Sequence, residues 1–172
     1  MAIAAGLLCA TPLFAQTKTP APAASPACTL KQRVGLTDIE IDYSRPGVKG
    51  RVIFGGLVPF DKVWRTGANE ATRITFSTPV KFNGEEVPAG TYALFTIPGK
   101  NEWTIILNKT AKQWGAFHYD DKADLLRVKS TPAELAEPVE TFTIDINDIR
   151  DDSATLNLIW DKTRVPVKLS LK

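Results

Sequence analysis

Short runs in which apolar and polar residues alternate recur along most of this chain, and they restrict it to a β-rich fold. Successive side chains of a strand point to opposite faces, so each run predicts a strand with one apolar and one polar face. Such strands cover a core from one side, as in antiparallel sheets. The runs lie at residues 38–43, 73–76, 103–107, 141–146, 155–160 and 165–171.

Turn-forming residues separate these runs. Asn83-Gly84 stands between two apolar segments and predicts a tight hairpin turn. Residues 88–90, 98–101 and 151–152 carry further turn signals. The window 132–136 is compatible with a turn of helix. About nine short strands joined in this way predict an all-β fold: an antiparallel β-sandwich or jelly-roll-like domain with one long ordered Gly/Arg-rich loop region.

The chain of 172 residues suits one domain preceded by an export segment. Residues 1–15 are apolar, uncharged and end on Ala15, which is typical of a signal peptide, although a basic n-region is missing. An N-terminal anchor is the alternative. Residues 16–27 are Pro/Ala-rich and predict a tether, and residues 28–172 predict a single β-sandwich domain. We therefore expect a periplasmic or secreted protein without a membrane span after signal cleavage.

The composition argues against several classes of function. A net charge of +2 and the lack of a basic run argue against nucleic acid as a partner. His118 is the only histidine, and Cys28 is the only cysteine beyond the signal segment, so one chain cannot assemble a His/Cys zinc site. The sequence has no phosphate-binding loop, dinucleotide fingerprint or Gly-x-Ser-x-Gly motif. We predict no cofactor and no metal.

Carboxylates offer the remaining route to enzymatic chemistry. Glu70 and Asp120 are candidates for the acid and base of a hydrolase, and His118 is a third candidate. A serine hydrolase would have to recruit His118, but no spacing selects a serine. The oxygen-rich turn at 145–152 suits calcium, although turn preference alone explains its acidic residues. The sequence leaves enzymatic activity open and favours a non-enzyme.

The stretch 41–72 holds the best candidates for a binding site, because its glycines, prolines and cations fit neither a helix nor a plain strand. Arginine suits carboxylates and phosphates, and an indole stacks on flat ligands. Trp64 and Trp114 stand among glycine and polar residues and are candidates for a cleft, whereas Trp103 and Trp160 are expected in the core. The candidate ligand-binding residues are Arg45, Lys49, Arg51, Trp64, Arg65, Asn69, Glu70 and Trp114.

A purely structural role is the alternative for this cluster. Arg65 and Glu70 can pair with each other, or with Lys49 and Asp61, to pin the long loop against the sandwich. Ion-pair networks of this kind also occur where no ligand binds. Both interpretations stay open at the level of sequence.

Several motifs in the chain resemble a known bacterial family. They are the stretches 43–51, 54–59, 63–72, 89–92 and 157–160. The family is domain-of-unknown-function family 2911, and the resemblance spans residues 30–172. It implies an exported β-rich domain and brings no established activity or catalytic residues.

These features together favour an exported accessory module of the cell envelope that binds a ligand or a partner. A small molecule, a glycan or an envelope protein would each suit the cluster of cations and indoles. The alternatives are a carboxylate-dependent hydrolase and a purely structural envelope domain.

Overall fold

The computed structural model describes residues 21–171, so the predicted signal peptide at 1–15 and the first part of the tether lie outside the described residues. Apart from one single-turn 3₁₀-helix, the regular structure of residues 21–171 is β-strand. The elements are β1 (Ala27–Val34), β2 (Thr37–Ser44), β3 (Thr72–Phe76), β4 (Val80–Phe82), β5 (Glu85–Val87), β6 (Gly90–Ile97), β7 (Trp103–Asn108), η1 (Asp121–Ala123), β8 (Asp124–Ser130), β9 (Ala133–Asn147) and β10 (Ser153–Leu171). No helix in this part of the chain has the length and apolar character needed to span a bilayer.

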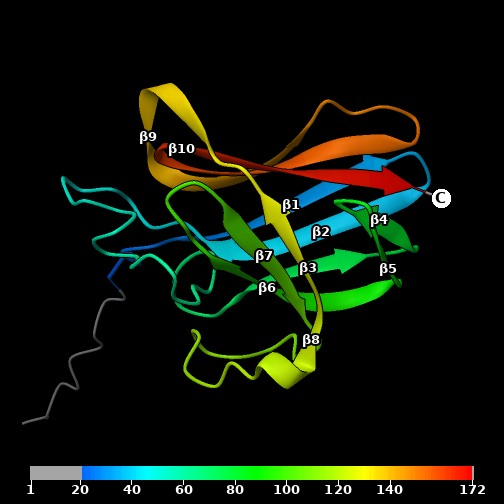
Figure 1. Ribbon diagram of the computed structural model, residues 1–172, viewed down its shortest axis with the longest axis horizontal. Helices are drawn as coiled ribbons and strands as arrows, with labels where there is room; N and C mark the ends of the chain where they lie inside the picture. Colours follow the sequence, from blue (N-terminus) through cyan, green and yellow to red (C-terminus); the bar gives the residue numbers. More distant parts are fainter. Residues whose placement is uncertain (1–20, 172) are drawn as a thin grey trace, which may run out of the picture.

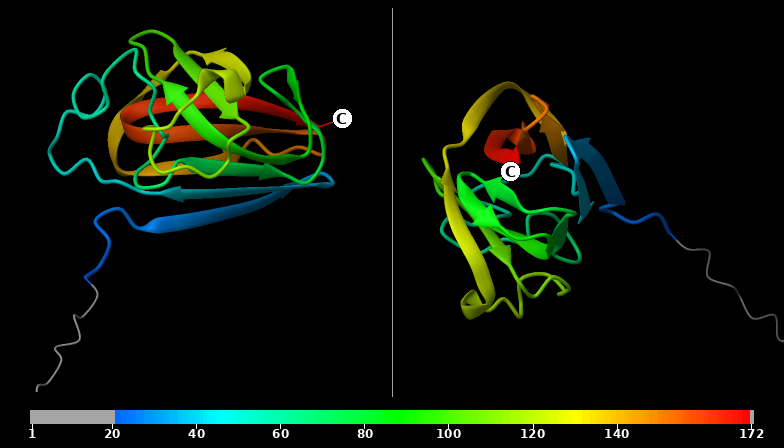
Figure 2. Two further views of the ribbon diagram at one scale, coloured as in Figure 1. Left: turned by 90° about the horizontal axis from the view of Figure 1, so that it is seen from below. Right: turned by 90° about the vertical axis from the view of Figure 1, so that its right-hand side faces the viewer.

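The strands form two antiparallel sheets that pack face to face (Figures 1 and 2). The larger sheet has the order β1-β2-β3-β6-β7-β8, and the smaller has the order β5-β4-β10-β9. The segment from β8 into β9, yellow in Figure 2, carries the chain from one layer to the other. The predicted all-β, sandwich-like fold is confirmed.

The alternating runs place their apolar side chains between the two sheets. In β2, Ile39, Ile41 and Tyr43 are buried, while the acidic residues between them are partly exposed. Ile41 lies opposite Ile74 of β3, so apolar faces match across the ladder. Alternation is a local property of the sequence, which explains why these strands could be predicted without tertiary contacts.

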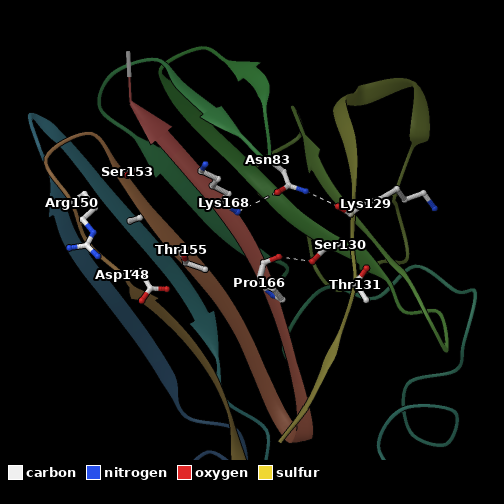
Figure 3. A pocket seen from close by; sticks show the side chains of 11 residues that line it. Asn83, Lys129, Ser130, Thr131, Asp148, Arg150, Ser153, Thr155, Pro166 and Lys168 are labelled. Atoms are coloured by element: carbon white, nitrogen blue, oxygen red, sulfur yellow. Dashed lines mark hydrogen bonds between the residues drawn. The ribbon is translucent and has the colours of Figure 1, made fainter.

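The strand β10 folds back on itself near Asp161, where φ is +51°, so its two halves lie side by side (Figures 1 and 3). The Leu171 backbone N–H donates to the Asp152 carbonyl at 2.7 Å, which joins the two ends of this hairpin. The predicted helical turn at 132–136 is wrong. Most of that window belongs to β9, and Glu134 lies opposite Thr163 of β10, because pairing along the sheet outweighs the weak local helix preference.

An aromatic cluster fills one end of the space between the sheets. Trp103 and Trp160 are 2% and 1% exposed, which confirms that both belong to the core. The Trp64 indole stacks on that of Trp160 at 5.7 Å between ring centroids and an interplanar angle of 18°. Phe54 and Phe142 complete the cluster through edge contacts with these rings. The cluster joins the loop after β2 to both layers.

Candidate functional site

Two of the predicted arginines pin the loop that follows β2, which is drawn in cyan at the left of Figure 1. The Arg45 guanidinium donates from Nε to the Phe142 carbonyl at 3.0 Å and from Nη2 to Thr143 Oγ1 at 2.7 Å. Arg51 donates to the carbonyls of Val48 at 3.0 Å and Gly47 at 2.6 Å. Arg45 therefore ties the loop to β9, whereas Arg51 satisfies two carbonyls within the loop itself.

Lys49 and Asn69 join the same loop to other segments. The Lys49 backbone N–H donates to Glu140 Oε1 at 2.9 Å, and its Nζ reaches the Ala24 carbonyl at 3.5 Å. Asn69 Nδ2 donates to Ser44 Oγ at 3.2 Å and, less closely, to the carbonyl of Ser25. The end of the predicted tether therefore lies against this loop.

The expectation that Trp64 faces a cleft is wrong. Its side chain is 8% exposed, stacks in the aromatic cluster and donates from Nε1 to the Gly67 carbonyl at 3.1 Å. The backbone of Trp64 exchanges two hydrogen bonds with Thr96 of β6, at 2.7 and 2.9 Å. A short bridge to the large sheet therefore turns the indole into the core.

Arg65 is a predicted ligand-binding residue with a hydrogen-bond donor that has no partner in the structure. Its Nε is buried and has no hydrogen-bond partner, and within residues 21–171 its guanidinium forms no ion pair. The predicted pairs of Arg65 with Glu70 or Asp61, and of Glu70 with Lys49, do not form among these residues. Burial lowers the pKa of the Arg65 guanidinium, but arginine is so basic that the side chain keeps its charge.

A segment far along the chain lies beside Arg65. Residues 109–123, here called the strap, run between β7 and β8 as the yellow-green loop at the bottom of Figure 1. Ala71 N–H donates to the Gln113 carbonyl at 3.0 Å, and Gly115 N–H donates to the Asn69 carbonyl at 3.1 Å. These two bonds flank an antiparallel bridge between Glu70 and Trp114, so the strap is paired to residues 69–71.

This pairing places Glu70 beside an exposed indole. In a non-hydrogen-bonded antiparallel pair the two side chains stand on one face, with Cβ atoms about 4.5–5.5 Å apart. Trp114 is 59% exposed, so its indole lies outside the core. A hollow of about 260 Å³ is lined by Asn69, Glu70 and Arg73 together with residues of β1 and β2, and Trp114 does not line it.

A second aromatic ring of the strap lies next to Arg65. Gly115 has φ +65°, and a Cβ there would lie 2.9 Å from the Phe117 ring and 3.7 Å from Arg65 Nη1. The ring and the guanidinium therefore both lie beside Gly115, and Phe117 is 78% exposed. We name Arg65, Glu70, Trp114 and Phe117 the platform. The sequence reasoning missed Phe117, although an apolar ring in an otherwise polar loop was an available signal.

The strap is anchored on the outer face of the large sheet. Its Ala116 and Tyr119 pack against a small second core that includes Phe95 of β6. Tyr119 Oη donates to Asp124 Oδ2 at 2.6 Å, and that carboxylate also accepts from Arg127 Nε at 2.8 Å and, on Oδ1, from Asn108 at 2.8 Å. Burial, reinforced by Asp124, raises the pKa of Tyr119, so the phenol remains a donor. These contacts hold the platform in place without a ligand.

The three weak catalytic candidates are used in different ways. Glu70 lies on the platform, whereas Asp120 caps η1 by accepting from the Lys122 N–H at 3.0 Å, and His118 is exposed on the strap. In the oxygen-rich turn, Asp145 Oδ2 accepts from Asn147 at 2.9 Å. Within residues 21–171, no three His, Cys, Asp or Glu side chains are grouped to hold a metal ion.

A separate trough of about 540 Å³ lies over the two halves of β10 (Figure 3). Asn83 bridges its far wall by donating to the Lys129 carbonyl at 2.7 Å and accepting from the Lys168 N–H at 3.4 Å. Asp148 and Arg150 lie together on the other side of the trough, so negative and positive charges are mixed there. None of the predicted ligand-binding residues lines this trough, and its charges favour no single class of ligand.

Comparison with known proteins gives a family and no activity. No curated protein matches the chain. No solved structure matches it either. One family model, described as a protein of unknown function (DUF2911), matches residues 25–169, which include every strand of the large sheet and the platform. The chain belongs to this family of unknown function.

Proposed function

We propose that this protein is an exported binding module that captures an anionic ligand on the platform. The observation that supports this proposal is the Arg65 guanidinium, which is partly buried and has no carboxylate partner within residues 21–171. Burying a charge without a counter-charge costs free energy, and an anionic ligand would recover that cost. Arginine presents a planar fork that suits a carboxylate or a phosphate.

The exposed rings add a second element of recognition. Trp114 and Phe117 are large apolar groups in a strap that is anchored beneath them. Exposed aromatic side chains on a fixed segment mark interaction sites, because they bury much apolar area at a small cost in entropy. A ligand with an anionic group and a flat apolar face would use both elements.

The proposed export rests on residues 1–15, which are apolar and end on Ala15. Expression of the full chain in a bacterial host, followed by fractionation and N-terminal sequencing, tests it. We expect a periplasmic product that begins at Gln16. An uncleaved product that remains in the membrane fraction would support an anchor instead.

Binding is tested with the purified chain by thermal shift and calorimetry against carboxylates, phosphates, sulfates and their neutral analogues. We expect an anion to stabilise the wild type and the response to disappear in Arg65→Gln. Arg33→Gln is the matched control, because Arg33 pairs with Asp38 on the exposed face of β1. An unchanged response in Arg65→Gln, or the same loss in Arg33→Gln, would exclude the platform as the site.

A further inference from the structure

We propose that the outer edge of β1 binds an extended segment of a partner protein, in which acidic residues alternate with apolar ones, as an additional antiparallel strand of the large sheet. In this mode of recognition, main-chain hydrogen bonds supply affinity and alternate side chains supply specificity. Binding here does not depend on the anion site proposed above, because it uses main-chain groups of β1 and no residue of the platform.

The strand β1 is an edge strand of the large sheet and is regular along its whole length. Its eight residues pair with β2 in one continuous register, from Ala27 opposite Ser44 to Val34 opposite Thr37. The right-hand view of Figure 2 shows β1, in blue, at the rim of this sheet. A long edge without a bulge can template the pairing of a further strand.

Alternate residues of β1 direct their main-chain groups away from the sheet. The Arg45 N–H donates to the Pro26 carbonyl at 2.9 Å, so the hydrogen-bonded pairs of this ladder fall on the even-numbered residues. The outward N–H and C=O groups therefore belong to Ala27, Thr29, Lys31 and Arg33. Among residues 21–171, one of these groups has a partner: the Arg33 carbonyl accepts from the Gln32 side-chain amide at 2.8 Å.

The other edges of the two sheets are short or partly covered. The Phe142 N–H of β9 donates to the Pro46 carbonyl at 2.9 Å, so the loop after β2 lies against that edge. On β8, the Lys129 carbonyl accepts from the Asn83 side chain at 2.7 Å. The strand β5 has three residues. Short and covered edges resist further pairing, which leaves β1 as the edge that is suited to accept a strand.

The outer face of β1 is basic, and the strand that it already pairs with is acidic. Lys31 Nζ lies 2.9 Å from Glu40 Oε2, and Arg33 donates to both Asp38 oxygens at 2.7 and 2.6 Å. These bonds use one of the three N–H donors of lysine and two of the five of arginine, so donors remain for a second carboxylate. Acidic side chains on an added strand would lie beside these cations, and opposite charges across a pair of strands stabilise a sheet.

The inner face of β1 calls for apolar residues on the added strand. Cys28 and Leu30 are partly buried and pack against the main core. Side chains of an added strand alternate between the two faces, so its acidic residues would lie on the outside and the residues between them would extend the core. The strand β2 has this pattern, with Ile39 and Ile41 between acidic residues.

A second copy of this chain fits the edge less well. Its own β1 would bring two more cations, Lys31 and Arg33, to this edge and no carboxylate. Like charges on adjacent strands destabilise their pairing. The same cations therefore disfavour self-association and favour an acidic strand.

Calorimetry with the purified chain and acetylated, amidated decapeptides, in which valine alternates with glutamate or with lysine, tests the recognition. We expect the glutamate peptide to bind at least about tenfold more tightly than the lysine peptide. N-methylation of the glutamate nitrogens should abolish binding, because these N–H groups would face β1. N-methylation of the valine nitrogens, which would face away, should preserve most of it. No binding of the glutamate peptide, equal affinity for the lysine peptide, or an equal loss from the two methylations would overturn the proposal.

Two pairs of variants place the site on β1. Thr29→Pro removes an outward N–H, which an edge strand tolerates, and should weaken the glutamate peptide by at least about tenfold. Thr29→Val keeps that N–H and should bind as the wild type does. Lys31→Gln should weaken binding by about fivefold, whereas Lys81→Gln, on the exposed side of β4, should not.

Circular dichroism and sedimentation complete the test. Each variant should keep the wild-type spectrum, so that a loss of peptide binding reports on the edge. Wild-type affinity in a folded Thr29→Pro variant would overturn the proposal. A wild-type dimer that Thr29→Pro dissociates would assign the edge to a second copy instead and would also overturn it.

Discussion

At the scale of single residues, two arginines of the same loop serve opposite purposes. Arg45 donates to a backbone carbonyl and to a hydroxyl of β9, whereas Arg65 has a buried Nε without a partner. Arg45→Gln should lower the free energy of unfolding by about 2 kcal/mol, because it removes hydrogen bonds from a charged donor. Arg65→Gln should leave it unchanged or raise it, because an uncompensated charge is removed. Urea denaturation measures both, and a large loss of stability in Arg65→Gln would mean that this arginine supports the fold.

Tyr119 makes the stability of the protein depend on pH in the alkaline range. Burial and Asp124 raise the pKa of Tyr119 above the usual value of about 10, so the unfolded chain loses this proton before the folded chain does. Its contribution is complete below about pH 10, and stability falls as the pH rises above that value. Tyr119→Phe should reduce the slope of stability between about pH 9.5 and 11 in urea titrations. Burial also raises the pKa values of Tyr43 and Tyr92, so some slope should remain, but an unaltered slope would contradict this role.

At the scale of elements, the strap depends on Gly115. Gly115→Ala should cost about 1–2 kcal/mol, because φ is +65° there, and should also displace the Phe117 ring and weaken ligand binding. Gly50→Ala is a matched control: Gly50 has φ +70° with open space around its Cβ position. It should show a similar loss of stability by urea denaturation and no loss of binding by calorimetry. Equal ligand binding by the two variants would show that Phe117 takes no part in the binding site.

The elements that could be predicted from the sequence are those whose signal is local. Alternation within each run predicts β2, β3 and β7 of the large sheet and β9 and β10 of the small one, whereas no run predicts β1 or β8. The hairpin turn at Asn83-Gly84 follows from its turn chemistry. The window 132–136 was misassigned because its conformation is decided by pairing with β10, which lies far along the chain. The burial of Trp64 and the position of Phe117 beside the Arg65 loop could not be predicted for the same reason. Trp64 joins a cluster of distant rings, and Phe117 meets Arg65 only because the strap pairs with residues 69–71.

At the scale of the whole molecule, the aromatic cluster connects the long loop to both sheets. Trp64 from the loop contacts Trp103 of the large sheet and Trp160 of the small one. Trp64→Ala should lower the free energy of unfolding by about 3–5 kcal/mol, because it opens a cavity at this junction. Val52→Ala is the control, since Val52 is 73% exposed in the same loop. Equal effects of the two variants in urea denaturation would show that the cluster does not unite the layers.

The four tryptophans differ in exposure, so one of them can serve as an intrinsic fluorescence probe. Three indoles are shielded in one cluster, while Trp114 is 59% exposed and stands on the strap. Its fluorescence should lie at the red edge of the emission band, where collisional quenchers reach it and leave the other three untouched. Iodide is itself an anion, so the charge of Arg65 should concentrate it near this indole. A bound ligand would protect Trp114 from iodide, and occupancy could then be followed in the unlabelled protein.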